Sequence, residues 1–363
     1  MRKVLLRIVF ERLWMLQSVG NELLVGYGWV ISLWILIALI SLAVLWRSTQ
    51  DKGQVLSSLI FWAGIPTAIA MVPVLGLPLA HSGLPLFGYG FMLFVGFSTA
   101  TWFAGRRAQS VGLSPDVIWD LMMWLLIPGI IGARIIYLLQ NWQRVFAGRS
   151  GPELIKAAIA LWDGGIVFYG CIIGGVIGML MFCRRRSIRP LQLADVIMPS
   201  LFVGLGFGRI GCFLYGCCFG APCQLPWAVS FPPDSMTYSA LKARGNEFLL
   251  PDLSGTIPLH PAQIYSSILA FLLAGFLAWY FRRRPFEGAV LALGWIIYPV
   301  NRFVLEYIRD DEPGRLGTGL TFSQLMSIGL FVSGCLLLLW LQKRPSGHNA
   351  QSDGRQSAME TTR

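Results

Sequence analysis

Four side chains on one predicted helix could bind an anion. Tyr298, Arg302, Glu306 and Arg309 recur at i, i+4, i+8 and i+11 in "GWIIYPVNRFVLEYIRDDE", so they share one helix face. Arg302 and Glu306 can form a buried ion pair, which would be a purely structural role. Two arginines flank the single glutamate, however, and surplus guanidinium in a water-poor site indicates an anionic ligand. Phosphate fits best, because arginine binds it through bidentate hydrogen bonds.

A second arginine lies in an unusual setting. The stretch "GRIGCFLYGCCFG" (208–220) places Arg209 among glycines, aromatic residues and cysteines, in a segment apolar enough to lie in lipid. The glycines Gly204, Gly208 and Gly211 remove side-chain bulk beside it. They can serve plain helix packing, or they can let a lipid chain approach the backbone next to the charge.

These residues need a membrane-spanning framework. The chain has 363 residues, 55% hydrophobic and 13% charged, against about 25% charged in ordinary soluble domains. The net charge of +11 does not indicate nucleic acid binding, because the basic residues cluster between apolar runs. We expect an all-α polytopic membrane protein with about nine transmembrane helices, at 23–46, 55–80, 86–104, 117–139, 157–183, 192–219, 261–281, 288–308 and 320–341. The fifth and sixth are long and glycine-rich, which predicts tilt or breaks.

Basic clusters set the expected orientation. They fall in every second connection and in the tail, which places the C-terminus and these connections in the cytoplasm and the N-terminus outside. The clusters are Arg47 with Lys52, Arg106 with Arg107, Arg184 to Arg186 with Arg189, Arg282 to Arg284, and Lys343 with Arg344. The basic N-terminus conflicts with this scheme, so either residues 1–20 form an interfacial amphipathic helix or the first two spans are miscounted.

In this orientation, six spans carry polar side chains near the outer surface. Each alone could be an interfacial anchor. Ionisable groups at membrane depth are nevertheless functional candidates, and the shared depth predicts one site. The set comprises Tyr89, Arg134, Asp163, Arg209, His260 with Gln263 and Tyr265, and Arg302 with Glu306.

The remaining segments suggest a domain division. Residues 220–259 are proline-rich and are expected to form a small extracytoplasmic cap between the sixth and seventh helices. Glu11 and Arg12 interrupt any signal-peptide core, so none is expected, and no internal repeat indicates a transporter. The division is then an N-terminal extension with two predicted spans, two parts of a core around the cap, and a disordered cytoplasmic tail: 1–84, 85–219, 220–259, 260–344 and 345–363.

Four of the seven cysteines cluster near the end of the sixth span. Cys212, Cys217, Cys218 and Cys223 lie on the side expected to be oxidising, so a disulfide involving Cys223 is one interpretation. Buried free thiols are the other. No histidine spacing completes a metal site, so we expect no metal.

Six ordered motifs resemble the bacterial prolipoprotein diacylglyceryl transferase family. The resemblance covers roughly residues 85–341 and leaves residues 1–84 outside it. The "GRIGCFLYGCCFG" stretch is similar to the family pattern Gly-Arg-x-Gly-Asn-Phe-x-Asn-x-Glu-x-x-Gly. The motifs are "GYGFMLFVGF" (88–97), "GARIIYLLQNW" (132–142), "LWDGGIVFYG" (161–170), "ADVIMPSLFVGLGFGRIGCFLYGCCFG" (194–220), "HPAQIY" (260–265) and "YPVNRFVLEYIR" (298–309).

The resemblance implies transfer of a diacylglyceryl group from phosphatidylglycerol to the lipobox cysteine thiol of a preprolipoprotein, with release of glycerol phosphate. Arg209 and Arg302 would hold the headgroup phosphate, and Glu306 would orient Arg302. The expected catalytic residues are Arg209, Arg302, Glu306, Tyr169 and Tyr89. The expected substrate-binding residues are Arg209, Arg302, Tyr298, Arg134, Asp163, Gly220, Arg309 and His260.

This chain departs from the family pattern at several positions. Tyr169 stands where the family usually has a histidine proposed to activate the thiol, and Cys212, Tyr215 and Cys217 replace two asparagines and a glutamate. A tyrosine could act as the base only with a lowered pKa. Three accounts are open: another base acts, the substrate has changed, or the protein binds lipid without transferring it. The candidate bases are Tyr169, Glu306, Asp163 and His260.

The expected protein is thus a multi-pass transferase of the bacterial inner membrane, with its active site toward the extracytoplasmic side. Its expected partners are phosphatidylglycerol, lipobox-containing preprolipoproteins and membrane lipids, with no nucleic acid and no cofactor. Two other functions stay open: a non-enzymatic phospholipid-binding protein of the same fold, and a transporter or channel. Glycerol phosphate release and solute flux would discriminate among the three.

Overall fold

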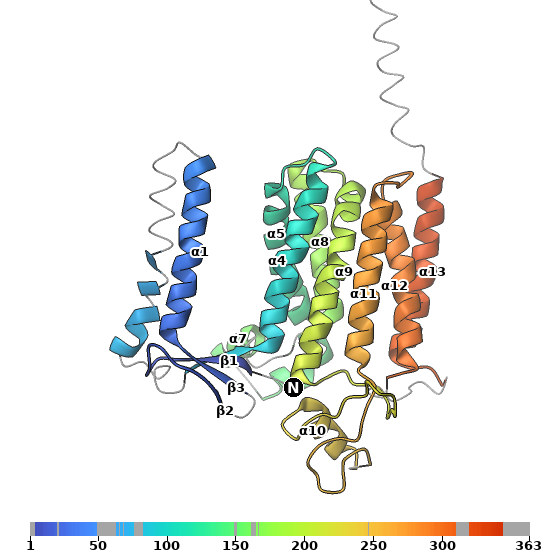
Figure 1. Ribbon diagram of the computed structural model, residues 1–363. Coiled ribbons are helices and arrows are strands. Elements are labelled where there is room, and N and C mark those ends of the chain that lie inside the picture. Colours follow the sequence, from blue (N-terminus) through green and yellow to red (C-terminus); the bar gives the residue numbers. More distant parts are fainter. Residues whose placement is uncertain are drawn as a thin grey trace, which may run out of the picture. The chain divides into compact units, whose positions relative to one another are not determined.

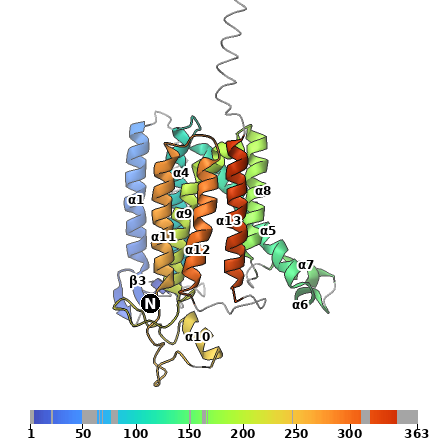
Figure 2. The ribbon, with the colours of Figure 1, turned by 90° about the vertical axis from the view of Figure 1, so that its right-hand side faces the viewer.

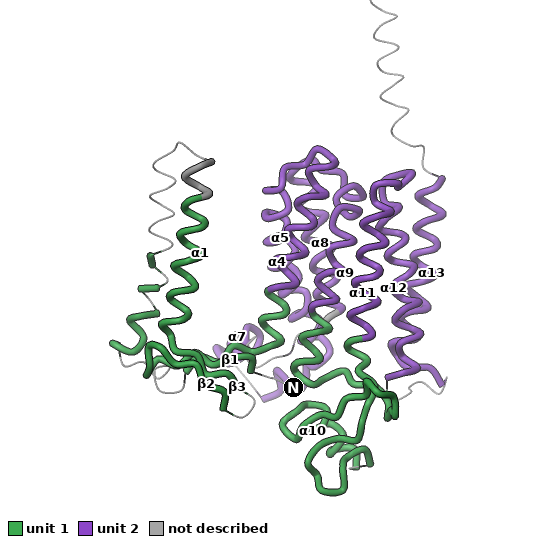
Figure 3. Tube along the Cα trace, in the orientation of Figure 1, with its two compact units in different colours: residues 1–94, 208–264 green, residues 95–207, 265–363 purple. Residues whose placement is uncertain are grey.

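A computed structural model describes residues 4–19, 22–48, 63–64, 66–67, 69–75, 83–148, 151–160, 165, 167–245, 247–309 and 319–343. The expected tail lies outside this set. The chain forms two compact units (Figure 3): unit 1 comprises residues 1–94 and 208–264, and unit 2 comprises residues 95–207 and 265–363. Three helices contribute residues to both units: α4 (Gly88–Gln109), α9 (Pro190–Tyr215) and α11 (Ala262–Phe281).

Unit 1 contains a four-stranded sheet that the sequence analysis did not predict. Its strands, in the order β2-β3-β1-β4, are β1 (Val4–Val9), β2 (Leu16–Val19), β3 (Glu22–Gly26) and β4 (Leu84–Phe87). β1 runs parallel to β3 and antiparallel to β4. The expected amphipathic helix over residues 1–20 is therefore wrong, and the all-α class holds only outside this sheet. The pairing partner of β1 lies far along the chain, where local periodicity carries no information about it.

The sheet also shifts the first expected span. Residues 23–26 belong to β3, and helix α1 begins at Tyr27 and runs to Ser48. Gly26 and Gly28 lie so close to the backbone of Leu13 that an added Cβ atom at either would come within 2.7 Å of its carbonyl oxygen. The tight approach explains why glycine stands at the strand-to-helix junction. The second expected span, 55–80, lies largely outside the described residues.

The second part of unit 1 folds around its own apolar core. Its short helix α10 (Met236–Ala243) begins with Ser235, whose hydroxyl accepts a hydrogen bond from the Tyr238 amide. The Tyr238 hydroxyl in turn donates to the Leu253 carbonyl at 3.1 Å. The core consists of Phe219, Phe231, Tyr238, Leu241, Leu249 and Leu259. The segment expected as a cap, 220–259, thus has a packed structure of its own.

Unit 2 is helical. Figures 1 and 2 show α5 (Asp116–Gln140) beside α8 (Phe168–Arg186), and α12 (Ala289–Glu306) beside α13 (Phe322–Gln342). Two short helices, α6 (Trp142–Phe146) and α7 (Pro152–Ile159), lie between α5 and α8 in the chain. Fully buried side chains from five helices form its core: Ile118, Phe182, Val196, Leu277 and Val290.

Glycines set the close packing of α5 on α8. Gly170, Gly174 and Gly178 recur every four residues on α8, the small-residue spacing typical of packed membrane helices. An added Cβ atom at Gly174 would lie 2.0 Å from the Pro128 carbonyl oxygen, and one at Gly178 1.9 Å from that of Trp124. These positions therefore tolerate no side chain.

Five described helices are long and apolar enough to cross a membrane: α5, α9, α11, α12 and α13. They match five of the expected spans closely. The protein is a mostly helical, multi-pass membrane protein, and large apolar side chains such as Leu272 and Leu336 are more than 60% exposed on these helices, as a lipid-facing surface requires.

Two of the expected spans need separate comment. The expected 157–183 span is interrupted, since α7 ends at Ile159 and α8 begins at Phe168, so the predicted break is confirmed and the predicted start is wrong. The sixth span has no such break and runs as one helix past Pro199.

Candidate functional site

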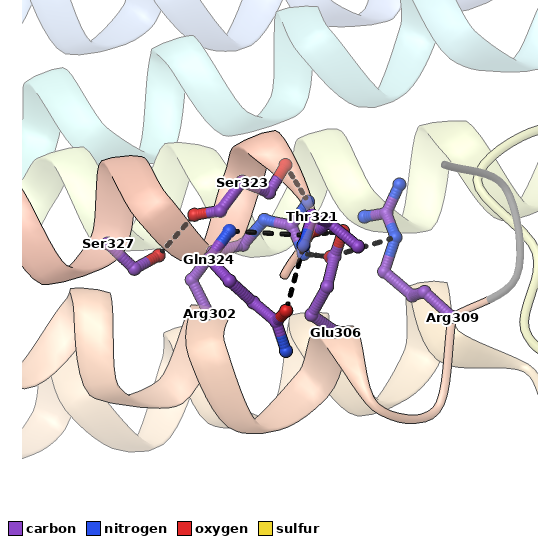
Figure 4. A network of polar contacts seen from close by, with 7 residues as sticks. All are labelled: Arg302, Glu306, Arg309, Thr321, Ser323, Gln324 and Ser327. Atoms are coloured by element: carbon purple, nitrogen blue, oxygen red, sulfur yellow. Dashed lines mark hydrogen bonds and ion pairs between the residues drawn. The ribbon is translucent and has the colours of Figure 1, made fainter. Parts of the chain in front are cut away.

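The first cluster of candidate residues joins the ends of α12 and α13 in unit 2 (Figure 4). Arg302 forms an ion pair with Glu306 through Nη1, and its Nη2 donates to the Ser323 hydroxyl at 2.9 Å. Arg309 approaches the same carboxylate, with 3.9 Å between its Nε and Oε2 of Glu306. The Glu306 side chain is 1% exposed. The prediction that two arginines flank one glutamate is confirmed, and these three side chains together carry one surplus positive charge.

Sequence reasoning missed the α13 side of this cluster. The Thr321 hydroxyl donates to Oε1 of Glu306 at 2.8 Å and also caps α13 by accepting from the Gln324 amide. Gln324 reciprocates by accepting from the Thr321 amide, which completes a capping box. The Thr-x-x-Gln spacing before an apolar run is a sequence signal for that cap. Nothing in the sequence indicates the Arg302–Ser323 contact.

Two candidate tyrosines lie in unit 2. Tyr169, in the first turn of α8, is 39% exposed, and its ring makes an edge contact with Phe322, with centroids 6.2 Å apart. Tyr298 lies one turn before Arg302 on α12, and its ring packs 5.7 Å from that of Phe202. Phe322 precedes Ser323, so Tyr169 contacts the helix end that carries the Arg302 cluster.

Arg134 makes backbone contacts that the sequence did not predict. Each of its three guanidinium nitrogens donates to a backbone carbonyl: Nε to Ala158 at 2.9 Å, Nη1 to Gly165 at 3.1 Å and Nη2 to Ala157 at 2.7 Å. Two of these carbonyls lie in the last turn of α7, where the helix dipole favours a cation. Arg134 thus fastens the connection before α8, and its expected part in substrate binding stays a prediction.

Arg209 is the candidate arginine in unit 1. Its Nε is buried, and no described residue accepts a hydrogen bond from it. The Tyr89 ring packs against the helix near Arg209, because an added Cβ atom at Gly211 would lie 3.0 Å from it. Tyr89 is 39% exposed, and its ring lies 6.2 Å from that of Tyr215. A buried donor without an acceptor is costly, which favours an anionic ligand at this position.

The segment after α9 is hydrogen-bonded to the residues just before α11. The Gly220 amide donates to the His260 carbonyl at 3.1 Å, and the His260 amide donates to the Ala221 carbonyl at 2.9 Å. Gly220 therefore positions the return of the chain, and its expected part in substrate binding stays a prediction. None of the seven cysteines, all of which are described, forms a disulfide, so the expected disulfide involving Cys223 is not formed.

The candidates fall into two sets. Unit 1 holds Tyr89, Arg209, Gly220 and His260, and unit 2 holds Arg134, Tyr169, Tyr298, Arg302, Glu306 and Arg309. Asp163 lies outside the described residues. That Arg209 and Arg302 contact the same headgroup stays a prediction.

Comparison with known proteins agrees with the motif evidence. The profile of the family described as prolipoprotein diacylglyceryl transferase matches residues 78–340. The phosphatidylglycerol–prolipoprotein diacylglyceryl transferase of Clostridium tetani is 36% identical over 255 residues, which are 69% of this chain and 93% of that protein. Transferase 2 of Clostridium perfringens is 34% identical over 70% of this chain and 91% of its own. The Rhodopirellula baltica transferase is 28% identical and covers 88% of this chain. This chain belongs to the prolipoprotein diacylglyceryl transferase family.

Proposed function

We propose that this protein transfers the diacylglyceryl group of phosphatidylglycerol to the cysteine thiol of a prolipoprotein. Family membership supports the reaction, and one structural observation carries the proposal to this chain: the buried Nε of Arg209 has no acceptor among the described residues. A lipid phosphate supplies that acceptor. The proposal includes nine spans, a multi-pass location in the bacterial inner membrane and an active site facing the extracytoplasmic side.

The reaction requires positive charge around the leaving group. The thiolate sulfur attacks the glycerol carbon that bears the phosphate ester, a carbon–sulfur bond forms, and the carbon–oxygen bond to the phosphate breaks. Glycerol phosphate leaves with one more negative charge than the phosphodiester carried. Arginines that bind this phosphate stabilise the charge where it develops. In this proposal Arg209 binds the phosphate directly, and the surplus positive charge at Arg302 and Arg309 assists it.

The thiol proton needs an acceptor. Tyr169, Glu306, Asp163 and His260 are the candidates. The carboxylate oxygens of Glu306 already contact two arginines and the Thr321 hydroxyl, so they are occupied by these partners. Tyr169 contacts the end of α13 that carries the Arg302 cluster. We therefore rank Tyr169 first among the candidate bases. Tyr89 and Tyr298 would line the site, and His260 borders the 220–259 cap. The proposed reaction involves no cofactor.

The test uses the full-length protein in detergent with phosphatidylglycerol and a synthetic lipobox peptide. We expect release of glycerol phosphate and a peptide mass increased by one diacylglyceryl group. Arg209→Lys should lower the rate by about 10²–10³, since an ammonium cannot reproduce the bidentate contact. Arg282→Lys, at an exposed arginine, is the matched control.

Two outcomes would overturn the proposal. If the Clostridium tetani relative is active under the same conditions and this chain is not, the chain does not catalyse the transfer, and lipid binding that depends on Arg209 would identify it as a lipid-binding member of the family. Full activity of Arg209→Lys would remove Arg209 from the phosphate site.

A further inference from the structure

Three cysteine thiols meet beside Arg209. The Sγ atoms of Cys212, Cys217 and Cys218 all lie within 4.8 Å of one another. All three residues are partly buried. Cys212 is in the last turn of α9, three residues after Arg209, and the other two follow the helix end. We call these three residues the thiol trio.

The helix end itself assembles the trio. Gly216 takes a left-handed conformation with φ 74°, and its amide and that of Cys217 both donate to the Cys212 carbonyl, at 2.9 and 3.1 Å. Such a turn reverses the chain over the last turn of a helix. Cys218 also has a positive φ of 60°, an unfavourable conformation for a residue with a Cβ atom. Strain of this kind is retained where surrounding contacts impose it, and it is common at functional sites.

Neighbouring segments hold this turn in place. Thr237 on α10 donates to the Gly216 carbonyl from both its amide, at 2.8 Å, and its hydroxyl, at 3.0 Å. Gln263 donates to the Cys217 carbonyl through Nε2 at 2.6 Å. The backbone carrying two of the three sulfurs is therefore fixed from two sides, so the trio is pre-organised.

We propose that the thiol trio binds one thiophilic metal ion, with Cu(I) as the ion that fits best. Metal–sulfur bonds of about 2.3 Å place the sulfurs of a three-coordinate site on the order of 4 Å apart, close to the spacing here. Soft thiolates select Cu(I) and Zn(II) among biological metals. Among the described residues, no histidine, further cysteine or carboxylate joins this group as a fourth ligand. Structural Zn(II) almost always takes four ligands, whereas three thiolates suffice for Cu(I).

The surroundings suit the charge of such a site. Binding Cu(I) releases three thiol protons and leaves the site with two net negative charges. Arg209 lies three residues before Cys212 on α9, and its positive charge offsets part of this negative charge. The absence of a histidine, which made a metal site unexpected from the sequence, is no obstacle to three-sulfur coordination. This inference does not depend on the transfer reaction.

The test measures Cu(I) binding to the full-length protein in detergent, reduced and kept anaerobic, against a colorimetric Cu(I) chelator. We expect one Cu(I) per chain and the visible luminescence of a solvent-shielded copper–thiolate centre. Cys212→Ser, Cys217→Ser and Cys218→Ser should each weaken binding by about 100-fold or more, since even indirect partners of a metal contribute about 10–100-fold. Cys171→Ser, Cys223→Ser and Cys335→Ser are the controls and should bind as the parent does.

Several results would overturn the proposal. Equal Cu(I) affinity in the parent and in Cys217→Ser would exclude the trio as the site. Tighter binding of Zn(II) than of Cu(I), measured against a Zn(II) indicator, would exclude the assigned metal. If the protein isolated in air carries a Cys212–Cys217 disulfide, formed as dioxygen takes two electrons and two protons from the thiols, and the reduced protein binds no Cu(I), the trio is a redox pair in place of a metal site. No lipid or peptide is present, so failure here leaves the transferase proposal untouched, and an inactive transferase leaves this result untouched.

Discussion

The cluster around Arg302 in unit 2 depends on the carboxylate of Glu306. It accepts from Thr321 and pairs with Arg302 and Arg309 while its side chain is 1% exposed. Removing one partner of a buried pair leaves uncompensated charge and typically costs about 3–5 kcal/mol. Its loss therefore affects stability and the position of Arg302 together.

We predict that Glu306→Ala lowers the free energy of unfolding by about 3–5 kcal/mol and abolishes transfer. Glu306→Gln, which keeps the acceptor for Thr321, should be less destabilising. Thermal denaturation in detergent measures the first effect and glycerol phosphate release the second. The control is Glu287→Gln, which breaks the exposed Arg189–Glu287 pair and should change stability by about 0–1 kcal/mol. Equal stability of Glu306→Ala and Glu287→Gln would show that the cluster is not held by this carboxylate.

Tyr169 allows the question of the base to be decided. The Tyr169→Phe change removes the hydroxyl and keeps the ring that contacts Phe322. If the Tyr169 side chain, as the phenolate, takes the thiol proton, transfer should fall by about 10²–10⁴ in the variant while binding of phosphatidylglycerol is retained. Single-turnover rates and lipid binding, measured on one preparation, separate the two effects. Full activity of the variant would rule Tyr169 out and return the role to His260 or Asp163.

The residues also show what sequence alone can predict. The spacing of Arg302, Glu306 and Arg309 sufficed to predict their cluster, because a helix fixes which side chains share a face. Ser323 could not be predicted as a partner, since its contact spans two helices. The clustering of Cys212, Cys217 and Cys218 was predicted, but the close approach of their sulfurs was not, because it comes from a left-handed turn at Gly216 and Cys218 that side-chain type alone does not reveal.

At the scale of elements, helix packing was less predictable than helix existence. Five spans followed from length and hydropathy. The sheet did not, because β1 pairs with β4 across nearly the whole N-terminal segment. The α5–α8 contact is visible in the sequence only as glycines, whose role depends on which face they occupy.

That contact gives a paired prediction. Gly174→Ala would place a Cβ atom 2.0 Å from the Pro128 carbonyl oxygen, whereas an added Cβ atom at Gly175 meets nothing within 4 Å. We expect Gly174→Ala to destabilise by at least about 1–3 kcal/mol, because backbone atoms must move. Gly175→Ala should be neutral or stabilising by up to about 1 kcal/mol, the gain from alanine in a helix. Denaturation midpoints in detergent compare the two, and similar losses would disprove the packing argument.

At the scale of the whole molecule, the distribution of arginines and lysines predicts how the protein is oriented in the membrane. The arginines at the ends of α4 and α8 lie in the last turn of each helix, and the basic clusters predict that these ends face the cytoplasm. The 220–259 segment, with its own core, would then lie on the opposite side. This assignment places the proposed lipid site where a translocated prolipoprotein can reach it.

Two glycines offer a matched test of this orientation. Gly112 and Gly245 both have a positive φ, and neither has a neighbour within 4 Å of an added Cβ atom, so each site should accept a short epitope tag. Gly112 follows the arginines of α4 and is predicted to be cytoplasmic, while Gly245 lies in the predicted cap. In spheroplasts, an impermeant antibody should bind the tag at Gly245 directly and the tag at Gly112 only after permeabilisation. The reverse pattern would show the opposite membrane topology. The thiol substrate would then have to reach the site from the cytoplasm, where translocated prolipoproteins are not found.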